Sequence, residues 1–192
     1  MKLSKINRLC ILLLIIGTFS NLALAEMNSN PNQVIFNFSV ESGLNGWVVE
    51  DDGVMGGLSQ GGLKIDSEGH AVFSGEVSLK NNGGFSSIQH NFPAINVSNF
   101  ENAYIRLKGD GKRYQFRVKS SRSERPSYIY DFGTTGEWET VKVPLEKMYP
   151  TFRGNRLSIP DYPKQILAHL RFMIANGTAE SFKLVVDKIW LK

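Results

Sequence analysis

The chain is organised around the stretch Trp47-Val48-Val49-Glu50-Asp51-Asp52-Gly53-Val54-Met55-Gly56-Gly57-Leu58-Ser59. A short apolar run ends in paired carboxylates, and glycines then surround one methionine. Glycine lets a backbone turn sharply or approach another segment closely. An aspartate side chain can hold such a turn through nearby backbone amides. The stretch therefore predicts an architectural corner or the rim of a binding surface, in which Trp47, Gly53, Gly56 and Gly57 serve shape.

The two carboxylates of this stretch have a second interpretation. Hard cations such as calcium bind several oxygens, and sandwich loops often supply them. Asp51 and Asp52 lack the alternating spacing of a dedicated calcium loop, so turn capping is the favoured interpretation. Asp51, Asp52 and Met55 are kept as candidate binding residues, and no metal or cofactor site is expected.

On both sides of this stretch, short runs of alternating apolar and polar residues are separated by Gly, Asn, Asp and Pro. Many short strands with regular turn signals indicate an all-β protein, an antiparallel β-sandwich of the jelly-roll kind. The clearest pair, Tyr104 to Lys108 and Lys112 to Lys119, flanks Gly109-Asp110-Gly111, which predicts a short hairpin connection. The segment from Thr151 to Pro163 is long and irregular, which predicts a functional loop or a cap on the sheet.

The N-terminal residues predict a cleaved secretory signal. Lys2, Lys5 and Arg8 precede an apolar run, and Ala23-Leu24-Ala25 supplies the small residues that a signal peptidase reads. The alternative, an uncleaved membrane anchor, requires a longer apolar run. We therefore expect a signal peptide over residues 1–25, a flexible leader over 26–33 and a single β-jelly-roll domain over 34–192, in a protein that is exported to the periplasm or secreted.

Removal of this signal changes the net charge and the cysteine content of the chain. The formal net charge of +4 includes the three signal cations, so the mature chain is near neutral and gives no argument for nucleic acid. Cys10, the one cysteine, leaves with the signal. The mature domain is then expected to lack disulfides, reactive thiols and a transmembrane segment.

A basic stretch offers a candidate binding face. On an alternating strand Arg113, Arg117 and Lys119 share one face, and Arg106 and Lys108 are expected to join them across the hairpin. Such a face attracts acidic glycans, lipid headgroups or an acidic protein surface. The competing interpretation, favoured here, is an ordinary solvated sheet face whose charges prevent pairing with other chains.

Other candidate residues are less specific. A sugar site needs an exposed aromatic ring together with polar groups. Core burial is nevertheless expected for most of the candidate rings, which are Trp47, Trp138, Trp190, Tyr128 and Tyr130. The histidines lack paired spacing for zinc, and the serines lack a nucleophile elbow.

Several segments in order resemble one known family. Trp47 with Asp52-Gly53-Val54-Met55-Gly56-Gly57-Leu58-Ser59 is similar to the opening motif of the NADH:ubiquinone oxidoreductase (complex I) intermediate-associated protein family. The later matches are Phe73-Ser74-Gly75, Asn82-Gly83-Gly84-Phe85, Gly109-Asp110-Gly111 with Tyr114, Arg153-Gly154, and Phe182 with Asp187 and Ile189. The resemblance implies a galactose-binding-like β-jelly roll, with these glycines as structural positions. Its mitochondrial members are similar to non-catalytic chaperones of a respiratory complex.

These observations predict an exported, non-catalytic binding module whose partner is a protein or a glycan. Two alternatives remain open. One is a carbohydrate-active enzyme with acids such as Asp51, Asp52 or Asp131 in a groove, and the other is a periplasmic assembly factor for a membrane complex. No catalytic residue is assigned.

Overall fold

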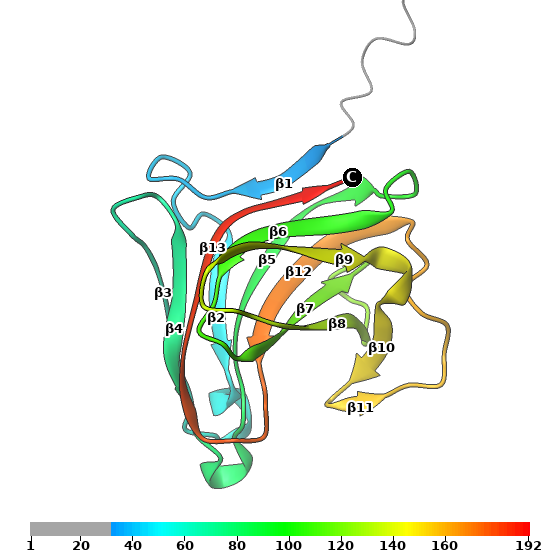
Figure 1. Ribbon diagram of the computed structural model, residues 1–192. Coiled ribbons are helices and arrows are strands. Elements are labelled where there is room, and N and C mark those ends of the chain that lie inside the picture. Colours follow the sequence, from blue (N-terminus) through cyan, green and yellow to red (C-terminus); the bar gives the residue numbers. More distant parts are fainter. Residues whose placement is uncertain (1–31) are drawn as a thin grey trace, which may run out of the picture. The chain divides into compact units, whose positions relative to one another are not determined.

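The structure, a computed structural model, describes residues 32–192 as two antiparallel β-sheets (Figure 1). The expected signal peptide, and the leader as far as residue 31, lie outside the described residues. Gln33, expected at the end of the leader, is the first residue of β1 and pairs with Leu191. The all-β sandwich predicted from the alternating runs is confirmed.

Sheet A contains, in spatial order, β3 (Gln60–Ile65), β4 (Ala71–Val77), β13 (Glu180–Leu191), β6 (Asn102–Lys108) and β9 (Trp138–Pro144). The first strand, β1 (Gln33–Asn37), pairs with the second half of β13. Sheet B runs β11 (Asn155–Arg156), β10 (Tyr149–Phe152), β8 (Ser127–Gly133), β7 (Arg113–Lys119), β12 (Ile166–Ile174), β5 (Ser86–Asn96) and β2 (Trp47–Asp51). Three short 3-10 helices are η1 (Asp52–Met55), η2 (Lys80–Asn82) and η3 (Leu145–Lys147).

The core lies between the sheets because each strand alternates buried and exposed side chains. On β7, Tyr114, Phe116 and Val118 are at most 1% exposed, whereas Arg117 faces the other way. The ring of Phe116 lies 5.4 Å from that of Phe172 on β12. Burying one such side chain contributes roughly 1.5–3 kcal/mol. The face assignment predicted for this strand is therefore correct.

The predicted hairpin at Gly109-Asp110-Gly111 is wrong. It connects β6 in sheet A to β7 in sheet B, so the chain crosses between layers there. Gly109 is required because a Cβ atom would overlap the side chain of Thr134. A short glycine-containing connection between two alternating strands has the same sequence pattern in a hairpin and in a crossover. Arg106 and Lys108 consequently lie in sheet A, not beside Arg117.

The segment from Thr151 to Pro163 is more regular than expected at its start. It begins as a hairpin, because β10 turns through Arg153 and Gly154 into β11. Both turn residues have positive φ, 50° and 80°, as a tight two-residue hairpin turn requires. This hairpin forms one edge of sheet B (Figure 1).

The aromatic residues divide between the core and sheet A. Trp47 and Tyr128 are buried as expected, and Trp47 stacks on His90 with ring centroids 5.1 Å apart. Trp138 and Trp190 are only half-buried and belong to strands of sheet A. Within residues 32–192, no helix is long and apolar enough to cross a membrane.

Candidate functional site

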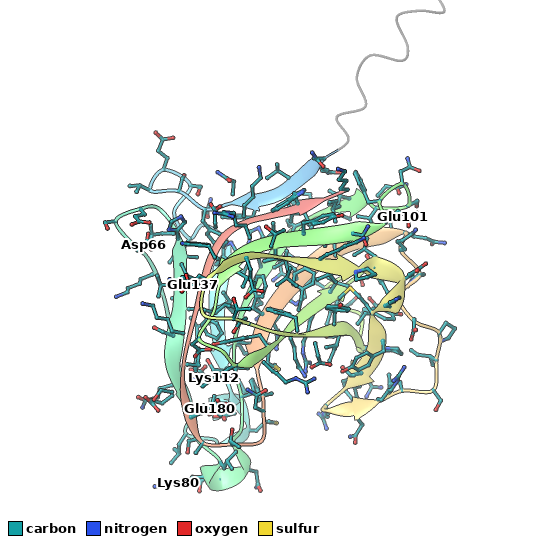
Figure 2. All side chains as sticks on the ribbon, in the orientation of Figure 1. Asp66, Lys80, Glu101, Lys112, Glu137 and Glu180 are labelled. Carbon is teal, nitrogen blue, oxygen red and sulfur yellow. The ribbon has the colours of Figure 1, made fainter. Side chains whose placement is uncertain are left out.

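A groove of about 500 Å³ crosses the outer face of sheet B, the face turned away from the core. One wall is the β10–β11 hairpin with Phe152 and Arg153, and the other consists of η1 and the loop from Asn82 to Phe85. In Figure 1 the hairpin (yellow) and η2 lie at opposite sides of the lower part of the domain. Figure 2 shows Lys80 of η2 at the outer tip of its loop.

Two further hollows, of about 480 and 400 Å³, adjoin this groove and share Ala175 with it. Gln115 lines both of them. The three together extend across β7, β8 and β12. Each volume falls within the roughly 300–1,000 Å³ typical of ligand sites, and three adjoining hollows suit an extended ligand.

Hydrogen-bonded side chains form the floor near β2. Arg171 contacts Glu50 at 3.0 Å and donates to Gln89 at 2.5 Å. Gln89 in turn donates to the other carboxylate oxygen of Glu50 at 2.9 Å. The three side chains come from β12, β2 and β5, so the contacts fix Arg171 across three strands.

The floor near β8 is a second network. Arg117 donates from Nε and from one Nη to the Oε1 of Gln115, at 2.9 and 2.5 Å. Gln115 donates to Asp131 at 3.0 Å, and Tyr149 donates to the other oxygen of Asp131. Burial, the hydrogen bond and the Asp131 charge raise the pKa of Tyr149 to about 12, so it remains a hydroxyl donor at neutral pH.

The lining of the groove and its two hollows is strongly cationic. Its cations are Arg117, Lys119, Arg125, Arg153, Arg171, Arg156, Lys112 and Arg113, and its acids are Glu50 and Asp131. Of the predicted basic face, Arg117 and Lys119 therefore line the main groove, and Arg113 lines an adjoining hollow. Arg106 and Lys108 do not reach it.

Three arginines lie over aromatic rings of the hairpin wall. The guanidinium groups of Arg125 and Arg153 lie 5.0 and 5.4 Å from the ring centre of Phe152. Arg156 lies 4.7 Å from that of Tyr149. Cations held over aromatic faces are attracted by the ring. Phe152, Arg153 and Arg156 fall within the segment predicted to be irregular, and no alternation of buried and exposed residues marks β10.

Asp52 joins the two segments of the opposite wall through buried hydrogen bonds. It is fully buried, and its carboxylate accepts hydrogen bonds from the backbone of Ser59 (2.9 Å), Gly84 (2.6 Å) and Phe85 (3.1 Å) and from the Ser59 hydroxyl (2.5 Å). Burial raises the pKa of Asp52, but these hydrogen bonds outweigh burial and leave it below its ordinary value. Asp52 therefore positions the wall and presents no group to a ligand.

The neighbouring candidates have different positions. Asp51 accepts hydrogen bonds from the backbone of Gly61 at 2.9 Å and from the hydroxyl of Ser86 at 2.5 Å, so it joins β2 to β3 and β5. Met55 lines the groove and is 60% exposed. Among residues 32–192, no group of three His, Cys, Asp or Glu side chains is placed to hold a metal ion.

The motif glycines serve shape in two ways. Positive φ occurs at Gly56, Gly84, Gly111 and Gly154, and an added Cβ would overlap neighbouring atoms at Gly57, Gly83 and Gly109. Gly57 is the most informative, because its missing side chain leaves room for the Asp52 carboxylate. Gly53 has neither constraint.

His169 lies on the same outer face, opposite Lys119 and Asn91, and its Nδ1 is 3.0 Å from the Asn91 side-chain oxygen. Burial first, and then the nearby charges of Arg171 and Lys119, lower the pKa of His169 to about 4. The imidazole is therefore neutral at pH 7. Burial is the main cause of this neutral state, and the positive floor adds to it.

Comparison with known proteins agrees with this architecture. Residues 36–186 match the family described as Complex I intermediate-associated protein 30 (CIA30). The chain belongs to the CIA30 family. The mouse (Mus musculus) mitochondrial complex I intermediate-associated protein 30 is 23% identical over 153 residues, which is 68% of this chain and 47% of the mouse protein. This CIA30-family chain thus spans about half the length of that relative.

Solved structures share the fold of this CIA30-family domain. A family 11 carbohydrate-binding module from Clostridium thermocellum, in complex with a β-1,3-1,4-mixed-linked tetrasaccharide, superposes with a TM-score of 0.62 at 18% identity, over 83% of this chain and 94% of the module. An exo-β-agarase superposes with a TM-score of 0.56 at 7% identity, over 83% of this chain and 24% of the agarase. The jelly-roll fold is therefore confirmed.

Proposed function

We propose that this domain is a non-catalytic module that binds a glycan along the groove of sheet B. The supporting observation is the groove itself, which has a polar floor and aromatic side chains in both walls. Gln115 and Tyr149, in an adjoining hollow, supply an amide and a hydroxyl group for sugar hydroxyls, and Phe85 and Phe152 line the walls of the groove. This combination is typical of carbohydrate sites.

The acids of the groove favour binding over hydrolysis. A glycosidase needs two carboxyl groups on opposite sides of the scissile bond. Glu50 is ion-paired with Arg171, and Asp131 is held by Gln115 and Tyr149. Asp52, proposed for the enzyme alternative, is buried in the wall. These carboxylates are engaged as parts of the scaffold.

Calorimetric titration with neutral and charged oligosaccharides tests this proposal. Phe85→Ala, in the groove wall, is expected to weaken binding about tenfold or more, because an aromatic contact is lost. Trp138→Ala, in sheet A, is the matched control and should leave affinity unchanged. Release of new reducing ends from a bound oligosaccharide would contradict the non-catalytic proposal.

A protein partner is the second candidate, as for an assembly factor. Four exposed apolar side chains favour it: Val54 (75% exposed), Met55 (60%), Leu58 (52%) and Leu79 (47%). They lie on the two segments that Asp52 joins. Leu58→Asp is expected to abolish capture of a protein from envelope extract and to leave glycan binding intact. Capture that survives this change would argue against the apolar loops as the docking site.

We also propose that the protein is exported, on the basis of the residues before Glu26. Mass spectrometry of the protein purified from its native cells should find a mature N-terminus at Glu26. A chain that retains Met1 to Ala25 would contradict this proposal.

A further inference from the structure

The floor of the groove places two guanidinium groups opposite each other. Arg117 on β7 and Arg171 on β12 are register partners on the outer face of sheet B. Like charges directly opposite each other destabilise a sheet. Lys119 follows two residues after Arg117 on the same face, and Glu50 is ion-paired with Arg171 only. The floor therefore carries positive charge that the fold does not neutralise.

Arg117 is compensated only indirectly, because the charge of Asp131 favours its cationic form without forming an ion pair with it. Within residues 32–192 no carboxylate oxygen lies within ion-pair distance of it, and both of its side-chain hydrogen bonds go to one oxygen of Gln115. A guanidinium has five N–H donors, so Arg117 keeps donors for a ligand in the groove that it lines. Burial, followed by the charge of Arg171, lowers its pKa to about 10, and it stays charged at pH 7.

We propose that the groove binds a polysaccharide with oxyanion substituents, either carboxylates or sulfate esters, and that Arg117 and Arg171 hold one such group together. The proposal rests on the glycan-binding function and specifies its ligand class. Guanidinium groups pair with such oxyanions through two parallel hydrogen bonds. A bound oxyanion also offsets the repulsion between the two arginines. The amides and hydroxyl beside them favour a glycan over an acidic peptide, because sugar hydroxyls need both donors and acceptors.

This arrangement predicts opposite effects of one substitution on stability and on binding. Arg117→Gln removes the like-charge contact, so the thermal midpoint of the free protein should rise by about 2–4 °C. The same change removes the oxyanion partner, so affinity should fall. A residue with a merely structural role would lower both. Arg117→Lys keeps the charge and loses the paired donors, and it should bind with intermediate affinity.

The test is calorimetric titration of the full mature chain with three tetrasaccharides: an oligogalacturonate (carboxylate), a carrageenan fragment (sulfate) and a neutral mixed-linked β-glucan. We expect at least one charged glycan to bind about tenfold or more tightly than the neutral one. The stronger of the two identifies the substituent. Arg117→Gln should remove this preference. Arg106→Gln, on the outer face of sheet A, is the matched control and should not change it.

The outcomes separate this inference from the proposed function. Equal binding of all three glycans, unaffected by Arg117→Gln, would overturn the oxyanion inference and leave glycan binding standing. Binding of a poly-glutamate peptide, with no binding of any glycan, would overturn both. A lower thermal midpoint in Arg117→Gln would also contradict the inference, because it would make Arg117 a stabilising residue.

Discussion

The charged and aromatic side chains on the outer faces of the two sheets have different interaction partners. In sheet A, Arg106 pairs with Asp187 at 3.3 Å, and its guanidinium also covers the ring of Trp138. Trp190 stacks on Tyr104 with ring centroids 5.5 Å apart. On this face Arg106 therefore has an acidic and an aromatic partner in the same sheet, although its register partner Lys188 is also cationic.

In sheet B the cations outnumber the acids around a hollow. Arg117 has no ion-pair partner among residues 32–192. Arg171 lies opposite Arg117 and is ion-paired with Glu50, which pairs with no other cation in that range. The difference indicates that Arg106 in sheet A has an ion-paired counter-charge within the described fold, whereas Arg117 in sheet B does not. Sheet B presents a surface that a counter-charged ligand would complete. This contrast is sharper than net charge, because the chain from Glu26 onward is near neutral.

The largest effect is expected in the wall of the sheet B groove. Asp52→Ala leaves the backbone amides of Ser59, Gly84 and Phe85 without their acceptor, and the Ser59 hydroxyl keeps only its longer contact with the carbonyl oxygen of Ser78, at 3.3 Å. Unfolding in urea should show a loss of about 3 kcal/mol or more. The control in sheet A, Asp187→Ala, should cost less than about 1 kcal/mol because its ion pair is partly exposed. Similar losses in the two variants would remove the distinction between the wall and the surface pair.

A smaller effect is expected from pH, through His169 in the floor of sheet B. Its pKa is lowered from 6.5 to about 4, so between these values the unfolded chain binds a proton that the folded chain does not. Stability from this residue is therefore lost as pH falls from about 6.5 to 4, by at most about 3 kcal/mol. His169→Gln should flatten the profile of urea midpoints against pH. An unchanged profile would show that burial and the nearby cations do not hold this imidazole neutral in the folded chain.

The smallest effect is expected for the charge pair of sheet A. Arg106→Gln should change the free energy of unfolding by less than about 1 kcal/mol, because exposed ion pairs contribute little. A double-mutant cycle with Asp187→Asn measures the coupling directly. A coupling of several kcal/mol would mean that sheet A depends on its surface charges as much as the groove wall depends on Asp52.

Much of the fold could be predicted because side-chain alternation is a local property. The strand carrying Arg113 to Lys119 has the predicted faces, and Trp47 is in the core. Whether a short connection returns to the same sheet depends on distant partners. The connection at Gly109 therefore has the pattern of a hairpin, although it passes from β6 in sheet A to β7 in sheet B.

The candidate site could be predicted only in part. Arg117 and Lys119 were selected by charge and alternation, and both line the groove. Arg171 is on a different strand, 54 positions away in a mostly apolar run, and only the sheet register brings it beside Arg117. Asp52 positions the groove wall because its carboxylate is buried, and a turn motif does not indicate whether the side chain is buried. An aspartate in such a motif can be exposed to solvent as readily as it can be buried against four hydrogen-bond donors.

The pairing of β1 with β13 has a consequence for engineering the domain. Gln33 and Leu191 are register partners, so their Cα atoms are about 5 Å apart. A short linker can therefore join the two ends, and new termini can be opened at the exposed turn around Gly177. In such a circular permutant β13 would become the first strand, and a reporter attached at the new ends would sit where β12 passes into β13.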